Sequence, residues 1–245
     1  MRKIVLVFDI CSSTAMIENL VQNDRVADYV RLIDGYWAFL NSKRDHYSFT
    51  IYKFLGDGFI LLFENRESLD DVVNFFNELA RFSREVLMWF RKTYLDLTAL
   101  PREGITAAVA VGRIAEMKTQ NISQEEYVGR PINVACRLQG KMEELRHVGK
   151  LLMQADAYRM ISNHIYRKAC KETTRSLKYI SNAAEMRCYE YDAEIYLNRD
   201  WKRLHSPSTV TRQALADAET TAIRNVDLAN ITKTVLELIA ALKER

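Results

Sequence analysis

The sequence predicts an α+β fold built on a ferredoxin-like core, in the order β-α-β-β-α-β with additions, plus C-terminal helices. Three observations indicate it: apolar runs typical of strands, two long amphipathic stretches, and one hairpin pattern. The first run, Ile4 to Phe8, is continuously apolar, as in a central strand buried on both faces. Ser12, Ser13 and Thr14 follow it and are favourable helix N-caps.

Long helices are predicted on both sides of the hairpin. One runs from Ala15 to Leu40 and the other from Leu69 to Tyr94, because apolar side chains recur at helical spacing in both. Between them, the apolar runs Phe49 to Leu55 and Phe59 to Phe63 flank a Gly-Asp-Gly tip, which indicates a β-hairpin.

The second half of the core begins after Pro101 and Gly104, which interrupt the chain. Hydrophobic pattern and turn residues predict, in order, strands at 105–111 and 113–118, a polar loop at 121–131, a helix at 132–145, a strand at 151–153, a helix at 155–161, and a strand pair at 165–179 and 185–191.

The composition is that of a globular protein in a reducing compartment. The chain has 245 residues with a net charge of +3, which is too small to argue for binding nucleic acid or a membrane surface. No apolar run reaches the roughly 20 residues needed to span a bilayer, and the N-terminus does not have the pattern of a secretory signal. Four cysteines without CxxC spacing indicate packed, reduced thiols. We therefore expect a cytoplasmic protein.

The C-terminal part differs in character from the core. We expect residues 1–200 to form the main domain and residues 201–245 a helical extension. The extension carries a narrow seam with 3-4-3-4 spacing, formed by Leu228, Ile231, Val235, Leu238 and Leu242. This seam either packs back on its own domain or pairs with a second chain.

Two acids stand at predicted strand ends. Asp9 ends the first strand, and Asp57 lies at the hairpin tip between two glycines, where the backbone can approach a ligand closely. A carboxylate pair at adjacent strand ends suits Mg²⁺ or Mn²⁺ shared with substrate phosphates. The turn of Ser12, Ser13 and Thr14 then leads into a helix N-terminus, which is receptive to phosphate; plain helix capping is the alternative role of these hydroxyls.

Four segments in this order and spacing resemble one known family: Phe8–Thr14, Lys53–Phe59, Gly104–Gly112 and Tyr127–Leu138. Together they resemble the class III nucleotidyl cyclases, the adenylate and guanylate cyclase family. The resemblance covers residues 3–191.

The resemblance implies roles for five of these residues. Asp9 and Asp57 would hold two Mn²⁺ or Mg²⁺ ions per active site, with the Ile10 carbonyl assisting. Asn133 and Arg137, four apart on one helix face, would orient the ribose and stabilise charge on the α-phosphate; an arginine suits that charge because it is always ionised and planar.

The resemblance also implies base-reading residues and an assembly. Lys53 and Glu126 fall where family members read the base, with one donor and one acid. The metal acids come from one subunit and the other site residues from its partner, which implies a homodimer with composite active sites and a nucleoside triphosphate substrate.

Two positions depart from the family pattern. Ser12 stands where most members have Gly. The turn before the last strand, which usually carries a phosphate-contacting lysine, reads Ser-Asn-Ala-Ala-Glu at 181–185. Lys178 or Arg187 is the candidate to replace that lysine.

The identity of the nucleotide is left open by the base readers, since Lys53 and Glu126 can serve several bases with a small change of pose. A one-ring base needs bulk where a purine would extend, and Tyr52, Tyr47 and Phe49 are the candidates, although strand aromatics are commonly core residues. Within the family, a compact cyclase with Asp-Ile-x-Ser-Ser-Thr, here at 9–14, and an appended helical tail resembles the pyrimidine cyclases of bacterial anti-phage defence, called Pycsar. Those enzymes make cyclic UMP or cyclic CMP for a separate effector. This favours UTP, then CTP, with ATP as the alternative.

Two other classes of protein compete with this interpretation. Polymerase palms and GGDEF-type synthases also place two acids on a ferredoxin-like core, but the sequence does not have their signature hairpin and has Asn133 with Arg137 instead. A catalytically inactive, dimerising regulator with this fold is the non-enzymatic alternative.

Overall fold

The computed structural model describes residues 1–65, 67–96, 100, 102–117, 126–144, 148–178, 180 and 185–194. The predicted tail at 201–245 and most of the turn at 181–185 lie outside these residues. In chain order the elements are β1 (Arg2–Ile10), α1 (Ser13–Gln22), α2 (Ala27–Tyr47), β2 (Phe49–Phe54), β3 (Gly58–Glu64), α3 (Asp70–Tyr94), β4 (Ile105–Arg113), β5 (Ala115–Met117), β6 (Glu126–Val128), α4 (Arg130–Glu144), β7 (Lys150–Gln154), α5 (Ala155–Arg159), α6 (His164–Lys168), β8 (Cys170–Arg175) and β9 (Met186–Asp192). The predicted α+β class is confirmed.

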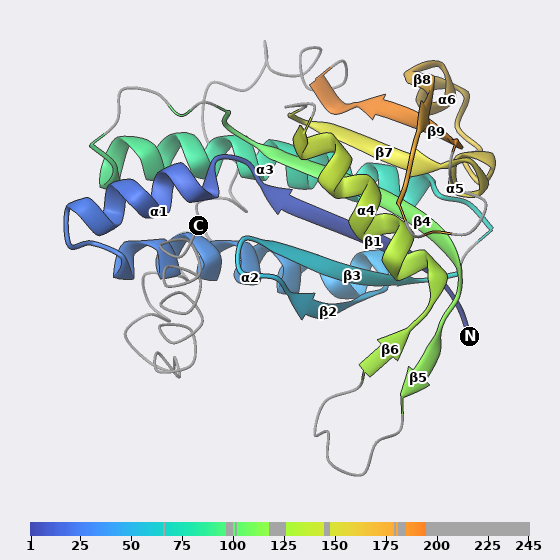
Figure 1. The fold of residues 1–245 in the computed structure, drawn as a ribbon, viewed down its shortest axis with the longest axis horizontal. Coiled ribbons are helices and arrows are strands. Elements are labelled where there is room, and N and C mark those ends of the chain that lie inside the picture. The colour runs from blue at the N-terminus through green and yellow to red at the C-terminus, as the bar shows by residue number, and fades with distance from the viewer. Residues whose placement is uncertain are drawn as a thin grey trace.

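A seven-stranded mixed sheet in the order β2-β3-β1-β4-β7-β9-β8 organises the molecule. β1 pairs antiparallel with both β3 and β4, and β4 pairs parallel with β7. Helices α1, α2 and α3 cover one face of the sheet, and α4 lies across the other (Figure 1). We call the second face the α4 face. β5 and β6 form a separate two-stranded hairpin that projects beyond the seven-stranded sheet (Figure 1).

Alternation along β1 gives each face its own core. Ile4, Leu6 and Phe8 pack into the larger core under α1–α3, whereas Val5 and Val7 pack under α4. This two-sided burial explains why the strand is continuously apolar.

The predicted helix from Ala15 to Leu40 is wrong in one respect, because it is two helices. α1 ends before Asn23, whose side-chain Nδ2 donates to the Asn19 carbonyl at 2.8 Å, and Asp24 takes a left-handed φ of 56°. Asn and Asp tolerate that conformation and compete for backbone hydrogen bonds, so they end a helix without any break in apolar spacing.

Two further boundaries differ from prediction. The predicted strand at 165–179 begins as α6, because the side chain of Asn163 caps that helix by accepting from the Ile165 N–H at 2.9 Å; only 170–175 are strand. The predicted loop at 121–131 contains β6, which pairs with β5 and so places Glu126 on a strand.

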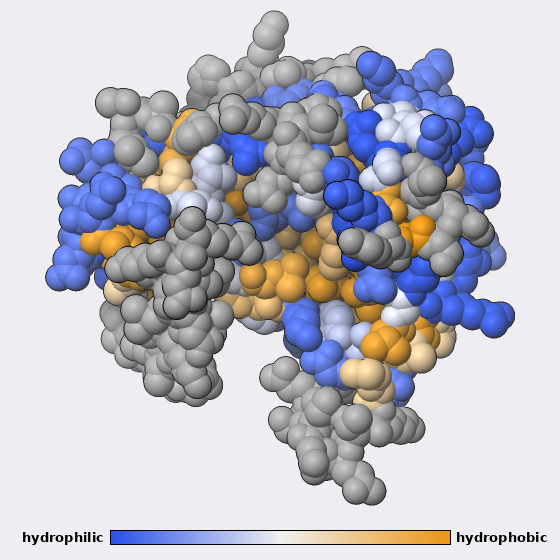
Figure 2. Space-filling view, in the orientation of Figure 1, coloured by the Kyte–Doolittle hydropathy of each residue, from blue (hydrophilic) through white to orange (hydrophobic). Residues whose placement is uncertain are grey.

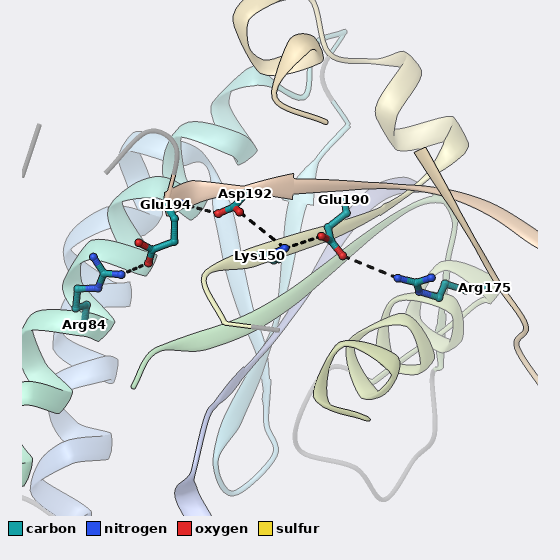
Figure 3. Close-up of polar contacts among 6 residues, drawn as sticks. All are labelled: Arg84, Lys150, Arg175, Glu190, Asp192 and Glu194. Atoms are coloured by element: carbon teal, nitrogen blue, oxygen red, sulfur yellow. Dashed lines mark hydrogen bonds and ion pairs between the residues drawn. The ribbon is translucent and has the colours of Figure 1, made fainter. Parts of the chain in front are cut away.

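Ion pairs join the strands at the far edge of the sheet (Figure 3). Lys150 Nζ lies 2.8 Å from Glu190 Oε1, and Arg175 Nη2 lies 3.9 Å from Glu190 Oε2. Arg84 on α3 pairs with Glu194, just after β9. These pairs tie β7, β8 and β9 to one another and the end of β9 to α3.

Two other expectations concern the state of the cysteine thiols and the presence of a membrane-spanning segment. All four cysteines are free thiols, and burial raises the pKa of Cys188 to about 11, which keeps that thiol protonated. Within the described part of the chain, none of the helices combines the length and apolar character that a membrane crossing requires.

Candidate active site

The acid pair forms because β1 and β3 lie side by side. Asp9 is opposite Gly58 in the β1–β3 register, and the Ile10 N–H donates to the Asp57 carbonyl at 2.9 Å. A side chain at Gly58 would collide with this arrangement, since a Cβ there would lie 2.3 Å from the Phe8 carbonyl and 3.0 Å from Asp9 Oδ1. Glycine at position 58 is therefore required for the end of β1 to pair with the start of β3 beside the two acids.

Asp9 lies on the α4 face of the sheet. It alternates with Val5 and Val7, which pack on that face, and it is half-buried. Asp57 is also half-buried, at the tip between β2 and β3. The two predicted metal acids thus lie at one end of the sheet, where β1 ends and β3 begins.

The serine-rich turn after β1 binds both neighbouring segments. Ser12 takes a left-handed φ of 63°, and its Oγ accepts from the Arg102 N–H at 3.0 Å. Ser13 Oγ donates to Asp57 Oδ2 at 2.7 Å, whereas Thr14 is exposed. The conformation of Ser12 explains why a glycine suits this position, because glycine adopts positive φ without strain. The turn leads into the N-terminal end of α1, whose first amides have no intrahelical acceptor.

The carboxylates of Asp9 and Asp57 fit a divalent cation that is shared with a phosphate. Among the described residues, no group of three or more His, Cys, Asp or Glu side chains is arranged to hold a metal ion. Asp9 and Asp57 are a pair of hard oxygen donors, and Mg²⁺ or Mn²⁺ bound by one or two carboxylates completes its shell with water and phosphate oxygens.

A second group of site residues meets beside β2. The pairing of β2 with β3 shifts register between Ile51 and Lys53, so Tyr52 is bulged. Adjacent strand residues normally point to opposite faces, but here both reach Glu126 on β6: Tyr52 Oη donates to Oε2 at 2.8 Å, and Lys53 Nζ lies 3.1 Å from Oε1. The predicted base readers therefore form one cluster, and Tyr52 belongs to it.

Hydrogen bonding fixes the protonation of this cluster. Tyr52, the strongest influence, and then Lys53 lower the pKa of Glu126, so the carboxylate is ionised at neutral pH. Burial and the neighbouring carboxylate raise the pKa of Tyr52, which keeps its hydroxyl a donor. Tyr52 Oη also accepts from the Tyr127 N–H at 2.9 Å, which anchors the ring to β6.

Asn133 and Arg137 lie on the side of α4 that faces away from the sheet. Both are exposed, while Val134, Ala135 and Leu138 are buried against the sheet. Their shared face confirms the helical spacing from sequence. It also directs them away from the surface on which Asp9 of the same chain lies.

The cations near the last two strands differ in their surroundings. Arg187 alternates with Met186 and Cys188, which pack under α4, so it lies on the opposite face, where Glu172 holds it at 2.6 Å. Lys178 is exposed. Arg175 lies beside α4 and interacts with Glu190 (Figure 3). Of the two predicted substitutes for the missing lysine, Arg187 therefore points away from the α4 face and is paired with Glu172, whereas Lys178 is exposed.

Apolar side chains are exposed on the sheet beside α4 and on the β5–β6 hairpin (Figure 2). Leu55 at the β2–β3 tip is 44% exposed, Met117 on β5 is 39% exposed and Val128 on β6 is 47% exposed. Met117 and Val128 lie on the same β5–β6 hairpin, and exposed apolar patches are typical of surfaces that contact another protein.

One residue of this region could not be identified from the sequence pattern. Tyr29 on α2 is 1% exposed, and its hydroxyl has no hydrogen-bond partner among the described residues. Burial first, and then the carboxylates of Asp57 and Asp9, raise the pKa of Tyr29 well above its ordinary value, so its hydroxyl stays protonated. Its helical position alone gives no signal of this, because a tyrosine on a helix's buried face is ordinary core.

Comparison with solved structures identifies the fold. No family model and no curated protein matches the sequence. The guanylyl cyclase Cya2 matches with a TM-score of 0.59 and 16% identity, over 78% of this chain and 91% of that one. The adenylyl cyclase CyaB from P. aeruginosa matches with a TM-score of 0.57 and 17% identity, over 78% and 94%. A bacterial light-regulated adenylyl cyclase matches with a TM-score of 0.61 and 16% identity, over 91% of this chain and 57% of that one. The chain therefore has the fold of class III adenylyl and guanylyl cyclase catalytic domains.

Proposed function

We propose that this protein is a nucleotidyl cyclase, which converts a nucleoside triphosphate to its 3′,5′-cyclic monophosphate and pyrophosphate. The observation that carries the proposal is the acid pair, Asp9 and Asp57. The β1–β3 register brings these two residues to the end of neighbouring strands in a cyclase fold. The neighbouring cluster of Tyr52, Lys53 and Glu126 supports it, because one donor and one ionised acid can read the edge of a base.

Each group of site residues would have a separate role in the reaction. Asp9 and Asp57, with the Ile10 carbonyl, would hold Mn²⁺ or Mg²⁺, two ions per site, which supply activation of the ribose 3′-hydroxyl and charge neutralisation on the triphosphate. The amides of the turn at 12–14, at a helix N-terminus, would bind the phosphates. Asn133 would orient the ribose, and Arg137 would stabilise the α-phosphate as the 3′-oxygen attacks in line and pyrophosphate leaves.

A homodimer would complete each site. Asp9 lies on the sheet, while Asn133 and Arg137 point away from it on the outer side of α4, so a second copy can bring the two sets together. The apolar surface of Leu55, Met117 and Val128 provides area for that contact. The tail at 201–245 remains a candidate to assist it through its apolar seam.

The proposed substrate is a pyrimidine nucleotide, UTP before CTP. Tyr47 and Phe49 are buried in the core under α1–α3, so they do not shape a base pocket. Tyr52 alone of the three candidates lies at the Lys53–Glu126 cluster. There its ring would take up space that a purine needs. A pyrimidine product would fit an anti-phage role in which a separate effector reads the signal.

The alternatives remain an adenylate cyclase and an inactive, dimerising regulator. Purified protein incubated with Mn²⁺ and each of ATP, GTP, CTP and UTP separates all three. We expect cyclic UMP or cyclic CMP with pyrophosphate. Cyclic AMP as the main product would make Lys53 and Glu126 adenine readers, and absence of product from all four would favour the regulator.

A change at Tyr52 tests the basis of base selection. We expect Tyr52→Ala to lower the preference for UTP over ATP by about tenfold, since loss of pocket bulk changes discrimination by 1–3 kcal/mol. Tyr52→Phe, which keeps the ring and removes the hydroxyl, is the control and should retain most of the preference. The measurement is the ratio of kcat/KM for the two nucleotides; an unchanged ratio in Tyr52→Ala would exclude a shape role for this ring.

A further inference from the structure

Lys53 and Glu126 lie on two separate sheets. Lys53 is on β2, at one edge of the seven-stranded sheet, and Glu126 is on β6, which forms a two-stranded sheet with β5. In the part of the chain that the structure describes, no strand pairing therefore holds these two side chains beside each other. Side-chain contacts must set the geometry in which they would read a base.

The ion pair between Lys53 and Glu126 holds them only loosely. Lys53 Nζ lies 3.1 Å from Glu126 Oε1 and 3.3 Å from Oε2, and the two side chains are 49% and 23% exposed. Ion pairs this accessible to water contribute little, because solvent screens the charges and the long side chains lose conformational freedom. A second contact is needed to fix the carboxylate.

The Tyr52 hydroxyl supplies that contact. Its oxygen accepts from the Tyr127 N–H on β6 at 2.9 Å, and its hydrogen reaches Glu126 Oε2 at 2.8 Å. The Tyr127 carbonyl lies 3.0 Å away, but an ionised carboxylate is the stronger acceptor for the single hydroxyl hydrogen. The Tyr52 ring is itself held, because it packs edge-on against Tyr127, with 5.4 Å between ring centroids, and against the core under α4.

We propose that the Tyr52 hydroxyl is a positioning group that holds Glu126, on the β5–β6 hairpin, in register with Lys53 on the seven-stranded sheet; this inference rests on the proposed function. Oε2 of Glu126 is engaged by Tyr52, so Oε1 is the oxygen that accepts from an N–H of the base. Lys53 Nζ carries three hydrogens, one of which donates to an acceptor on the base. This role belongs to the hydroxyl and is distinct from the bulk of the ring.

Tyr52→Phe removes the hydroxyl and keeps the ring, so it tests the positioning role. We expect the Kd of 3′-deoxy-UTP and of 3′-deoxy-ATP, each with Mn²⁺, to rise by about tenfold, as for the loss of a hydrogen bond to a charged group. Neither analogue has the attacking 3′-hydroxyl, so binding is measured without turnover. The rise should be similar for both, because Lys53 and Glu126 would read either base, and the preference between the nucleotides is kept. Inorganic tripolyphosphate, which has no base, should bind as it does to the wild type, which a general loss of structure would not allow.

Tyr47→Phe is the matched control. Tyr47 Oη donates to Glu78 Oε1 at 2.6 Å, and Lys43 pairs with the same carboxylate, so the same three residue types meet between α2 and α3. Tyr47 packs in the core under α1–α3, on the other face of the sheet. Its substitution removes an equivalent hydrogen bond and should leave the Kd of all three ligands unchanged.

A double-mutant comparison shows whether Tyr52 acts through Glu126. Glu126→Ala should weaken both analogues at least as much as Tyr52→Phe does, and adding Tyr52→Phe to Glu126→Ala should change the Kd by less than about twofold, because the two residues share one interaction. Wild-type binding in Tyr52→Phe, or a full tenfold loss from it in the Glu126→Ala background, would overturn the inference and leave the proposed base readers in place. Wild-type binding in Glu126→Ala would instead remove base reading by this cluster from the proposed function, and the inference with it.

Discussion

Asp57→Asn is expected to lower cyclase turnover by about a thousandfold or more, because a metal-assisted step loses several kcal/mol of transition-state stabilisation when a ligand is removed. The amide retains an oxygen that can accept from Ser13, so the turn between β1 and α1 should keep its structure. The measurement is the initial rate of cyclic nucleotide formation at saturating Mn²⁺ and substrate, beside a melting curve that verifies the fold.

Asp24→Asn is the control for the same chemical change elsewhere. Asp24 is exposed in the turn between α1 and α2, with a positive φ that asparagine also tolerates. It should leave turnover within about twofold of the wild type, as surface substitutions away from a site generally change little. Wild-type turnover in Asp57→Asn itself would remove the metal role of this acid.

The parts of the site that sequence predicts are those encoded by local pattern. The Gly-Asp-Gly tip between two apolar runs predicts a hairpin with a projecting carboxylate, and the structure contains it between β2 and β3. Asn133 and Arg137 share a face simply because they are four residues apart on one helix. Each of these features needs only residues within a few positions of one another.

Contacts that join distant segments are the parts that sequence misses. The polarity of residues 121–131 predicts a loop, and Glu126 becomes a strand residue only because β5 pairs with β6. Ser13 reads as a helix cap, although its hydroxyl bonds an acid 44 positions away. The bulge at Tyr52 is equally invisible, since alternation predicts that Tyr52 and Lys53 point to opposite faces.

Mixing two inactive variants is expected to restore activity if the sites are composite. Asp57→Asn removes the metal half of each site, and Arg137→Ala removes the phosphate half. In a two-fold dimer that carries one copy of each variant, one site contains both defects and the other contains neither. At equal concentrations and random exchange, about half of the dimers are mixed and each has one intact site, so about a quarter of wild-type activity should return.

The control is a mixture of Asp57→Asn with Asp9→Asn. Both changes affect the same half of the site, so every site in the mixed dimer keeps one defect and activity should not return. Native mass spectrometry of differently tagged chains establishes that mixed dimers form in both experiments. If mixed dimers of Asp57→Asn and Arg137→Ala form and stay inactive, the outward direction of Arg137 on α4 has another purpose, and each active site must be built within one chain.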